Sequence, residues 1–149
     1  MPGLKSIAGV LAFIVMVLVI FVFLKVTKSN GDLVSVHADF NVGSEEIIHE
    51  FELSEKNAGD KYFDKIISIK GTLKKISKDE KGLYTIFLGD KGSTNSILCS
   101  MDLNHFSNEE KLYINNNLTI KGNCTGFVSD ELLGSDLIMN RCVLSKEVK

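Results

Sequence analysis

Apolar and polar residues alternate along the stretch 65–77. Ile67, Ile69 and Leu73 fall on one face at intervals of two, and polar residues fill most positions between them. This period predicts a strand with one buried face. Gly71 within it indicates a bulge, a sharp bend or the close approach of another backbone. A long first strand that bends at a glycine is typical of small closed barrels.

The same pattern predicts the other elements of the chain. A period near 3.6 through Ile47, Phe51, Ala58 and Tyr62 predicts an amphipathic helix over 44–62, with Ser44 as its N-cap. Further strands are expected over 83–88, 96–102, 118–128 and 136–145, with a short helical turn over 105–114. The order helix, three strands, short helix, two strands predicts a mainly β protein whose five strands form an OB-fold barrel.

One long apolar run lies near the start of the chain. Residues 7–24 hold no charged or strongly polar side chain, and 14 of them are Ile, Leu, Val or Phe. A helix of this length spans about 27 Å, close to the roughly 30 Å hydrocarbon core of a bilayer. We therefore expect a transmembrane helix over 7–24 after a tail of residues 1–6, with the membrane lipid bilayer as a partner.

Three other interpretations fit this run less well. A cleaved signal peptide would have a shorter apolar region and a small-residue cleavage site, which the following KVTKSNGD does not offer. A lipoprotein would need a cysteine directly after the run, and the first cysteine is Cys99. A core helix of this length and purity would be unusual.

The orientation in the membrane is weakly encoded. Lys5 and the amino terminus face Lys25 and Lys28 across the run, so the positive charges nearly balance. A short tail before a folded domain is typical of a signal anchor. We therefore expect a single-pass protein of the cell membrane with its C-terminal domain outside the cytoplasm, a linker over 25–43 and the OB-fold domain over 44–146.

The charge of the domain changes which ligands are expected. The whole chain has a formal net charge of −2, but the first 29 residues hold three lysines and no acid, which leaves 14 basic and 19 acidic residues in 30–149. Nucleic-acid affinity depends mainly on Lys and Arg that neutralise phosphates. A mildly acidic domain is therefore not expected to bind nucleic acid.

The chain from Ser54 to Cys142 resembles a known family. The resemblance covers about 45–145 and is carried by five pieces: Ala58 with Tyr62–Lys65, Ile69–Ile76, Ile97–Cys99, Ile120–Gly126 and Arg141–Leu144. It is similar to the tRNA-anticodon-domain-like OB-fold proteins, small bacterial envelope proteins that include many lipoproteins of unknown function. Many relatives carry glycine where this chain has Asp64, asparagine where it has Ser54, and Gly-Asp at Asn116–Asn117. The resemblance implies an OB-fold; its link to nucleic acid rests on fold analogy.

The barrel surface offers a weak candidate for ligand binding. OB-folds bind oligonucleotides on the face of their second and third strands, with stacked aromatic rings over a basic groove. Lys70, Thr72 and Lys74 align on the outer face of the first strand, and Phe87 lies on the second. The alternative is that these are ordinary solvent-exposed residues of the sheet that bind no ligand. With the loops 89–95 and 129–135, these residues form the contact surface that we expect, for a protein or glycan partner.

The three cysteines all lie in predicted strands. None forms a CxxC pair, so zinc binding is not expected. Outside the cytoplasm a disulfide is plausible, and the preferred pair is Cys124 with Cys142, because the loop between the last two strands returns the chain locally. The alternative is three buried free thiols.

No arrangement of residues predicts catalysis. The three histidines have no metal-ligand spacing, the GDKGST segment lacks the order of a phosphate loop, and no serine lies in a nucleophile elbow. We expect no metal, no cofactor and no enzyme activity. The sequence favours a membrane-anchored OB-fold binding or interaction module outside the cytoplasm, with a single-stranded nucleic-acid-binding OB-fold protein as the alternative.

Overall fold

The computed structural model describes residues 14–20, 33–106 and 112–145. They belong to two compact units, 1–32 and 33–149. In the first unit, residues 14–20 are helical, and the rest of the expected membrane helix over 7–24 lies outside the described residues. Within the described ranges, no helix is both long enough and apolar enough to cross a bilayer. Half of the expected helical turn over 105–114, residues 107–111, also lies outside them, and its described residues are not helical.

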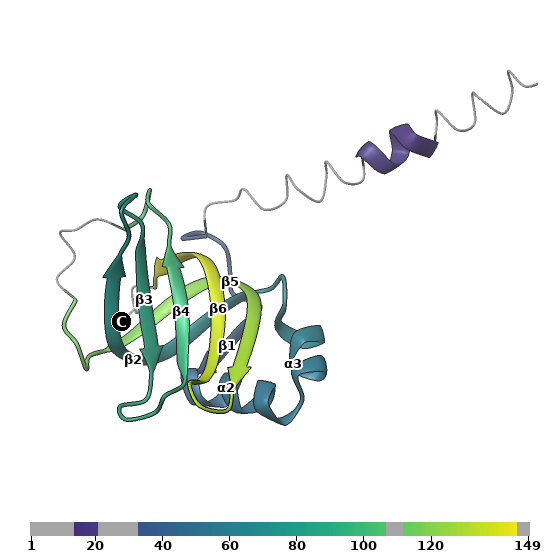
Figure 1. Ribbon diagram of the computed structural model, residues 1–149. Coiled ribbons are helices and arrows are strands. Elements are labelled where there is room, and N and C mark those ends of the chain that lie inside the picture. Colours follow the sequence, from purple (N-terminus) through teal and green to yellow (C-terminus); the bar gives the residue numbers. More distant parts are fainter. Residues whose placement is uncertain (1–13, 21–32, 107–111, 146–149) are drawn as a thin grey trace, which may run out of the picture. The chain divides into compact units, whose positions relative to one another are not determined.

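In its described residues, the second unit is a β-barrel with two helices (Figure 1). Its elements are β1 (Phe40–Gly43), α2 (Ser44–Leu53), α3 (Glu55–Tyr62), β2 (Ile66–Lys78), β3 (Tyr84–Gly89), β4 (Ser96–Met101), β5 (Asn117–Asp130) and β6 (Gly134–Leu144). The strand order is β1-β2-β3-β4-β6-β5, and β2 also pairs with β5. This second pairing closes β2 to β6 into a five-stranded barrel, which confirms the predicted OB-fold.

Strand β2 closes the barrel because its two halves pair with different strands. Its first half, up to Thr72, is antiparallel to β5, and its second half, from Thr72 on, is antiparallel to β3. Ile67, Ile69 and Leu73 are fully buried, as the alternation predicted. The closure of the barrel therefore depends on the residues where β2 changes partner.

Gly71 lies at this change of partner. A Cβ atom there would lie 2.9 Å from the Ser44 Oγ and 3.2 Å from the Leu88 Cβ, so the glycine is required by the close approach of α2 and β3. The bulge itself comes later, because the β2–β3 register shifts between Leu73 and Lys75. The sequence thus signalled a special position correctly, while the extra residue of the bulge is Lys74.

The prediction of a single helix over 44–62 is wrong. The chain forms α2 and α3, with Ser54 between them at φ −162° and ψ 96°. The Ser54 Oγ accepts a hydrogen bond from the Asn57 backbone N–H at 3.4 Å and so caps α3. Periodicity continues across such a break because both helices bury apolar residues against the same barrel. The N-cap of α2 is Gly43 rather than Ser44.

The helix α2 closes one end of the barrel (Figure 1). Ile47, Ile48 and Phe51 are buried, and the Phe51 ring stacks on Phe127 of β5 with 4.7 Å between the ring centroids. Such an aromatic pair adds to the burial of its own surface. The sheet and the helices therefore share one core.

The residues expected to be a linker, 25–43, include a strand. β1 runs parallel to β2, with Phe40 opposite Ile67. Its start is fixed at Asp39, whose backbone N–H donates to the Ile66 carbonyl at 2.7 Å and whose carboxylate accepts from the Ile66 N–H at 2.9 Å. A strand of four residues is too short to show a period.

Asp64 has a strained backbone conformation. Its φ is 60°, in the left-handed region. Its backbone N–H donates to the Cys124 carbonyl at 2.9 Å, which joins the turn after α3 to β5. An aspartate tolerates this conformation better than most residues.

Candidate functional site

A row of apolar side chains crosses the outer face of the barrel. Phe87 of β3 lies opposite Leu98 of β4, and Leu98 lies opposite Ile138 of β6. Their strand neighbours point into the core, so these three side chains point outward, and each is half-buried. Ile138 leans over Gly126 of β5, where a Cβ would lie 3.6 Å from its Cδ1. We call Phe87, Leu98 and Ile138 the outer row.

A lysine lies at one end of the outer row. The Lys75 ammonium is 5.4 Å from the centroid of the Phe87 ring, within the range of a cation–π contact. The register pairs Lys75 with Phe87 directly. The sequence pointed to Lys74 instead, because strict alternation through β2 ignores the bulge. The extra residue at the bulge moves every later side chain to the opposite face.

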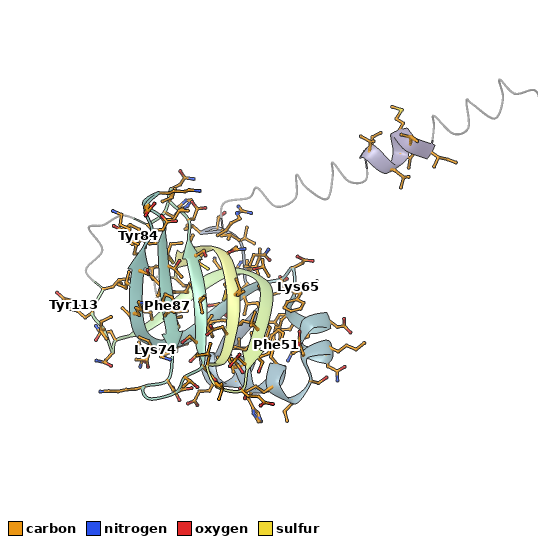
Figure 2. All side chains as sticks on the ribbon, in the orientation of Figure 1. Phe51, Lys65, Lys74, Tyr84, Phe87 and Tyr113 are labelled. Atoms are coloured by element: carbon orange, nitrogen blue, oxygen red, sulfur yellow. The ribbon has the colours of Figure 1, made fainter. Side chains whose placement is uncertain are left out.

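Lys74 stabilises a loop at the lower end of the barrel in Figure 2. Its ammonium donates to the carbonyls of Ser93 and Asn95 at 2.8 Å each, and to the Ser96 Oγ at 3.0 Å. Burial lowers the pKa of this amine, and the nearby charge of Asp136 opposes the shift. Lys74 therefore holds the loop between β3 and β4 in place and is not available to a ligand.

Two other predicted ligand residues lie beside β5. Lys70 is exposed and lies opposite Thr119. The Thr72 Oγ1 donates to the Asn117 Oδ1 at 3.0 Å, across the β2–β5 pair. Of the four residues expected to bind a ligand, only Phe87 belongs to the outer row. The structure does not bring the four together.

A second pair of lysine and aromatic side chains lies near the opposite end of β3. The Lys78 ammonium is 4.9 Å from the centroid of Tyr84, and the Tyr84 ring meets Phe106 edge-on at 5.1 Å. Figure 2 shows Tyr84 near the upper end of the barrel and Phe87 about midway along it. The β2–β3 hairpin thus carries two lysines over two rings.

The loops 89–95 and 129–135 meet at the other end, beside α2. The Glu52 Oε1 of α2 accepts from the Asn95 Nδ2 at 3.0 Å and from the Ser135 Oγ at 2.9 Å. The Ser135 backbone N–H donates to the Asn95 Oδ1 at 2.9 Å. The two loops that we expected in one contact surface are therefore joined by one network. We call this end of the barrel the loop end.

A cleft of about 230 Å³ opens at the loop end, between α2 and the β3–β4 loop. Its lining includes three carboxylates and one imidazole, from Glu45, Glu52, Asp90 and His49. In the described ranges, no group of three His, Cys, Asp or Glu side chains is placed to hold a metal ion. The cleft is thus an acidic pocket.

The β5–β6 hairpin tip projects beside this cleft. Because β5 and β6 run further than predicted, the tip shrinks to residues 131–133. The Asp130 Oδ1 accepts from the backbone N–H groups of Leu132 and Leu133 at 2.8 and 2.9 Å, and these bonds lower the pKa of Asp130. The two leucines are nonetheless 90% and 78% exposed.

The expected disulfide between Cys124 and Cys142 is not present. All three cysteines are free and buried thiols. The register places Cys124 opposite Met139 of β6, whereas Cys142 lies opposite Met101 of β4. The bulges between β5 and β6 set this register, so a short return loop was not enough to pair the two residues. Burial raises the pKa of the Cys124 thiol to about 12, and that of Cys142 also rises.

Sequence reasoning missed Lys75, Leu98 and Ile138 of the outer face and the carboxylate of Glu52. Leu98 and Ile138 are at outward positions of their strands. A single apolar residue at such a position does not indicate a site, and only the strand register shows that the two are neighbours. Glu52 looked like part of a solvated helix face. The leucine pair at 132–133, by contrast, was visible as two apolar residues inside a predicted loop.

Comparisons with known proteins find one family model and solved structures to which this chain is similar. The tRNA_anti-like family model matches residues 3–138. A crystal structure from Klebsiella pneumoniae subsp. pneumoniae MGH 78578, described as a putative nucleic acid-binding lipoprotein, matches with a TM-score of 0.55 and 17% identity over 71% of this chain and 91% of that chain. A putative aspartyl-tRNA synthetase from Leishmania major Friedlin matches with a TM-score of 0.39 and 10% identity over 76% of this chain and 22% of that chain. No curated protein matches the sequence.

Proposed function

This chain belongs to the tRNA_anti-like family, and from that premise we propose that its OB-fold barrel is a membrane-anchored binding module for a protein partner. The outer face of β3, β4 and β6 is its contact surface. The observation that carries the proposal is the outer row, in which Phe87, Leu98 and Ile138 align in register on three strands.

The chemistry of the outer row favours an uncharged, partly apolar ligand. The polar neighbours of the row on β3 and β4 are Thr85 and Ser100, which lie opposite each other and carry hydroxyl groups. An apolar centre with polar groups at its border is the usual anatomy of a protein interface. Lys75 at the end of the row covers the Phe87 ring and adds one positive charge.

The apolar run over 7–24 supports a membrane anchor. It has the length and composition of a spanning helix, and its described residues, 14–20, are helical. The lysines on both sides suit the head-group region. In this proposal the barrel lies outside the cytoplasm, where its partner is another envelope protein.

Single-stranded nucleic acid is the second candidate, because one specific contact favours it. Lys75 over the outward-facing Phe87 ring combines positive charge with an aromatic ring, the pairing that single-strand binders use, whereas Tyr84, beside Lys78, packs against the core. The crystal structure described as a putative nucleic acid-binding lipoprotein has the same fold. Against it stands the excess of acidic residues in 30–149, since phosphate binding requires a positive surface.

Photo-crosslinking from the outer row tests the proposal. With a benzophenone amino acid at position 98, irradiation of intact cells is expected to give a discrete protein adduct that nuclease does not change. Ile138→Lys should abolish that adduct, because a charge would then lie in the outer row directly beside position 98, while Lys70→Ala beside β5 should leave it intact. An absent adduct, or one that survives Ile138→Lys, contradicts the proposal.

Binding of a labelled dT oligonucleotide separates the second candidate from the first. Fluorescence anisotropy at low salt is expected to show no saturable binding by the full-length chain. Binding that weakens steeply with salt, and that Lys75→Ala and Lys78→Ala reduce, would instead favour nucleic acid.

A further inference from the structure

The loop end of the barrel carries the most exposed large apolar side chains among the described residues. Leu132 is 90% exposed, Leu133 is 78% exposed, and Leu53 at the end of α2 is 72% exposed. The bond between the Ser135 Oγ and the Glu52 Oε1 joins the hairpin to the residue directly before Leu53. Three leucines therefore lie at one end of the barrel, on two elements tied to each other.

Hydrogen bonds hold the backbone of the hairpin tip in place. The Asp130 carboxylate accepts from both leucine N–H groups, and the Ser129 and Ser135 hydroxyls are 3.2 Å apart across the base of the tip. Gly134 follows at φ 95°, where a Cβ would lie 2.6 Å from the Thr94 Oγ1 of the neighbouring loop. A tip fixed in this way loses little conformational entropy when a partner covers it.

The charge beside the leucines is negative. The cleft at the loop end is lined by Glu45, Glu52 and Asp90, and Asp130 and Glu131 belong to the hairpin itself. Lys91, exposed on the β3–β4 loop, opposes this charge, and Lys56, three residues after Leu53, is paired with Asp60 at 3.2 Å. The ammonium of Lys74 is already bonded to the loop carbonyls and the Ser96 Oγ. This field attracts cations and repels phosphate groups, both of nucleic acids and of anionic lipids.

From the exposed leucines and the charge around them, we infer that the loop end is a second docking surface, for a protein segment that places a Lys or Arg side chain next to apolar ones. The cation enters the acidic cleft, and the apolar neighbours cover Leu132 and Leu133. Charge complementarity selects this occupant over a nucleic acid or a membrane surface. The inference is independent of the proposed function, because it concerns the loop end rather than the outer row.

Photo-crosslinking of the full-length chain in intact cells tests it. The benzophenone amino acid replaces Leu133, and the matched control replaces Leu83, an exposed leucine of the turn between β2 and β3. We expect a protein adduct from position 133 and none of the same mass from position 83. Mass spectrometry of the adduct should map it to a partner segment that contains Lys or Arg beside apolar residues.

Three further substitutions, each made in the chain that carries the crosslinker at position 133, separate this docking from mere proximity. Leu132→Ser and the double change Glu45→Gln with Asp90→Asn should each lower the adduct about tenfold, the size expected when an interface anchor is removed. Lys91→Ala should keep or raise it. Glu52 is left in place because it holds Asn95 and Ser135, and a thermal melt of each variant checks that the fold is kept.

Four results would overturn the inference. They are no adduct from position 133, an adduct with lipid or nucleic acid, an adduct with a second copy of this chain, and a protein adduct that Glu45→Gln with Asp90→Asn leaves unchanged. The outer row is tested separately from position 98, so either proposal can fail without the other.

Discussion

Gly71 shows how much of this fold depends on one missing side chain. A Cβ at this position would meet the Oγ and Cβ of Ser44 at 2.9 and 3.0 Å and the Cβ of Leu88 at 3.2 Å. The neighbours are a helix start and a barrel strand, which cannot both move away without opening the packing between them. The glycine that the alternation singled out therefore lets α2 and β3 approach β2 at the same point.

Gly71→Ala is expected to destabilise the protein by about 1–3 kcal/mol, the usual cost of adding an atom to a filled space. Denaturant unfolding of the full-length chain measures it. Gly126→Ala is the control, since a Cβ there would meet Ile138 at an ordinary 3.6 Å. A Gly71→Ala protein as stable as the Gly126→Ala protein would show that the close approach is not a constraint.

The buried thiols predict a specific alkaline response. Because burial raises the pKa of Cys124 from 9.0 to about 12, the folded state holds the thiol proton over a range where the unfolded chain releases it. The stabilisation from this proton is complete below pH 9 and is lost as the pH rises toward 12. Cys124→Ala should remove that part of the pH dependence.

The measurement is the free energy of unfolding between pH 8 and pH 11 for both proteins, under reducing conditions. The difference between wild type and Cys124→Ala should shrink as the pH rises. A constant difference would mean that the thiol of Cys124 is not held protonated by the fold. Comparing two proteins removes the contributions of lysine and tyrosine side chains, which titrate in the same range.

At the scale of elements, the break between α2 and α3 depends on Ser54. Its hydroxyl caps α3 through the Asn57 N–H, and its own backbone N–H donates to the Glu50 carbonyl at 3.1 Å. Ser54→Ala is expected to cost about 1 kcal/mol in unfolding free energy, whereas Ser54→Asp keeps a capping oxygen and should cost less. Equal losses for both substitutions would argue that the cap does not matter.

The bulge in β2 gives two neighbouring lysines different roles. Lys74 holds the β3–β4 loop through three hydrogen bonds, and Lys75 lies on the outer face over Phe87. Lys74→Met is expected to destabilise the protein by about 1 kcal/mol and to speed amide exchange across 90–95. Lys75→Met should change neither by a measurable amount.

Hydrogen-exchange mass spectrometry of both variants tests which of the two lysines holds the β3–β4 loop. Faster exchange in the loop only for Lys74→Met supports the register with its shift between Leu73 and Lys75. If Lys75→Met were the variant that loosened the loop, the strand would be in strict alternation and the bulge would be misplaced.

At the scale of the whole molecule, the sequence was enough to predict the barrel but not its surfaces. Alternation predicted all five barrel strands and the core positions Ile67, Ile69 and Leu73, because a two-residue period is a local property of the chain. It missed β1, which has four residues and no period, and it joined α2 to α3, because both helices bury residues against one core. The strand ends were off by up to two residues, which is typical of boundaries set by pairing.

The candidate sites were predicted less well, for a physical reason. Which outward residues lie side by side depends on strand register, and two bulges in β5–β6 and one in β2 shift that register without a clear mark in the sequence. Phe87 was identified, but its neighbours Leu98 and Ile138 became a row only in the sheet. Lys74 was assigned to a ligand, and Cys142 to a disulfide, for the same reason.

The most direct test of the binding surface uses a cysteine introduced into the outer row, because the native thiols are all buried. Because Cys99, Cys124 and Cys142 are fully buried, a cysteine placed at Leu98 is expected to be the reactive thiol of the folded protein. Its labelling by a membrane-impermeant maleimide should be about tenfold slower in intact spheroplasts than in the purified chain, as for a partner present at about ten times its Kd. Leu83→Cys, outside the outer row, should be labelled equally in both. Equal labelling of Leu98→Cys in spheroplasts and in purified protein would contradict the account, because the outer row would then be uncovered where the protein works.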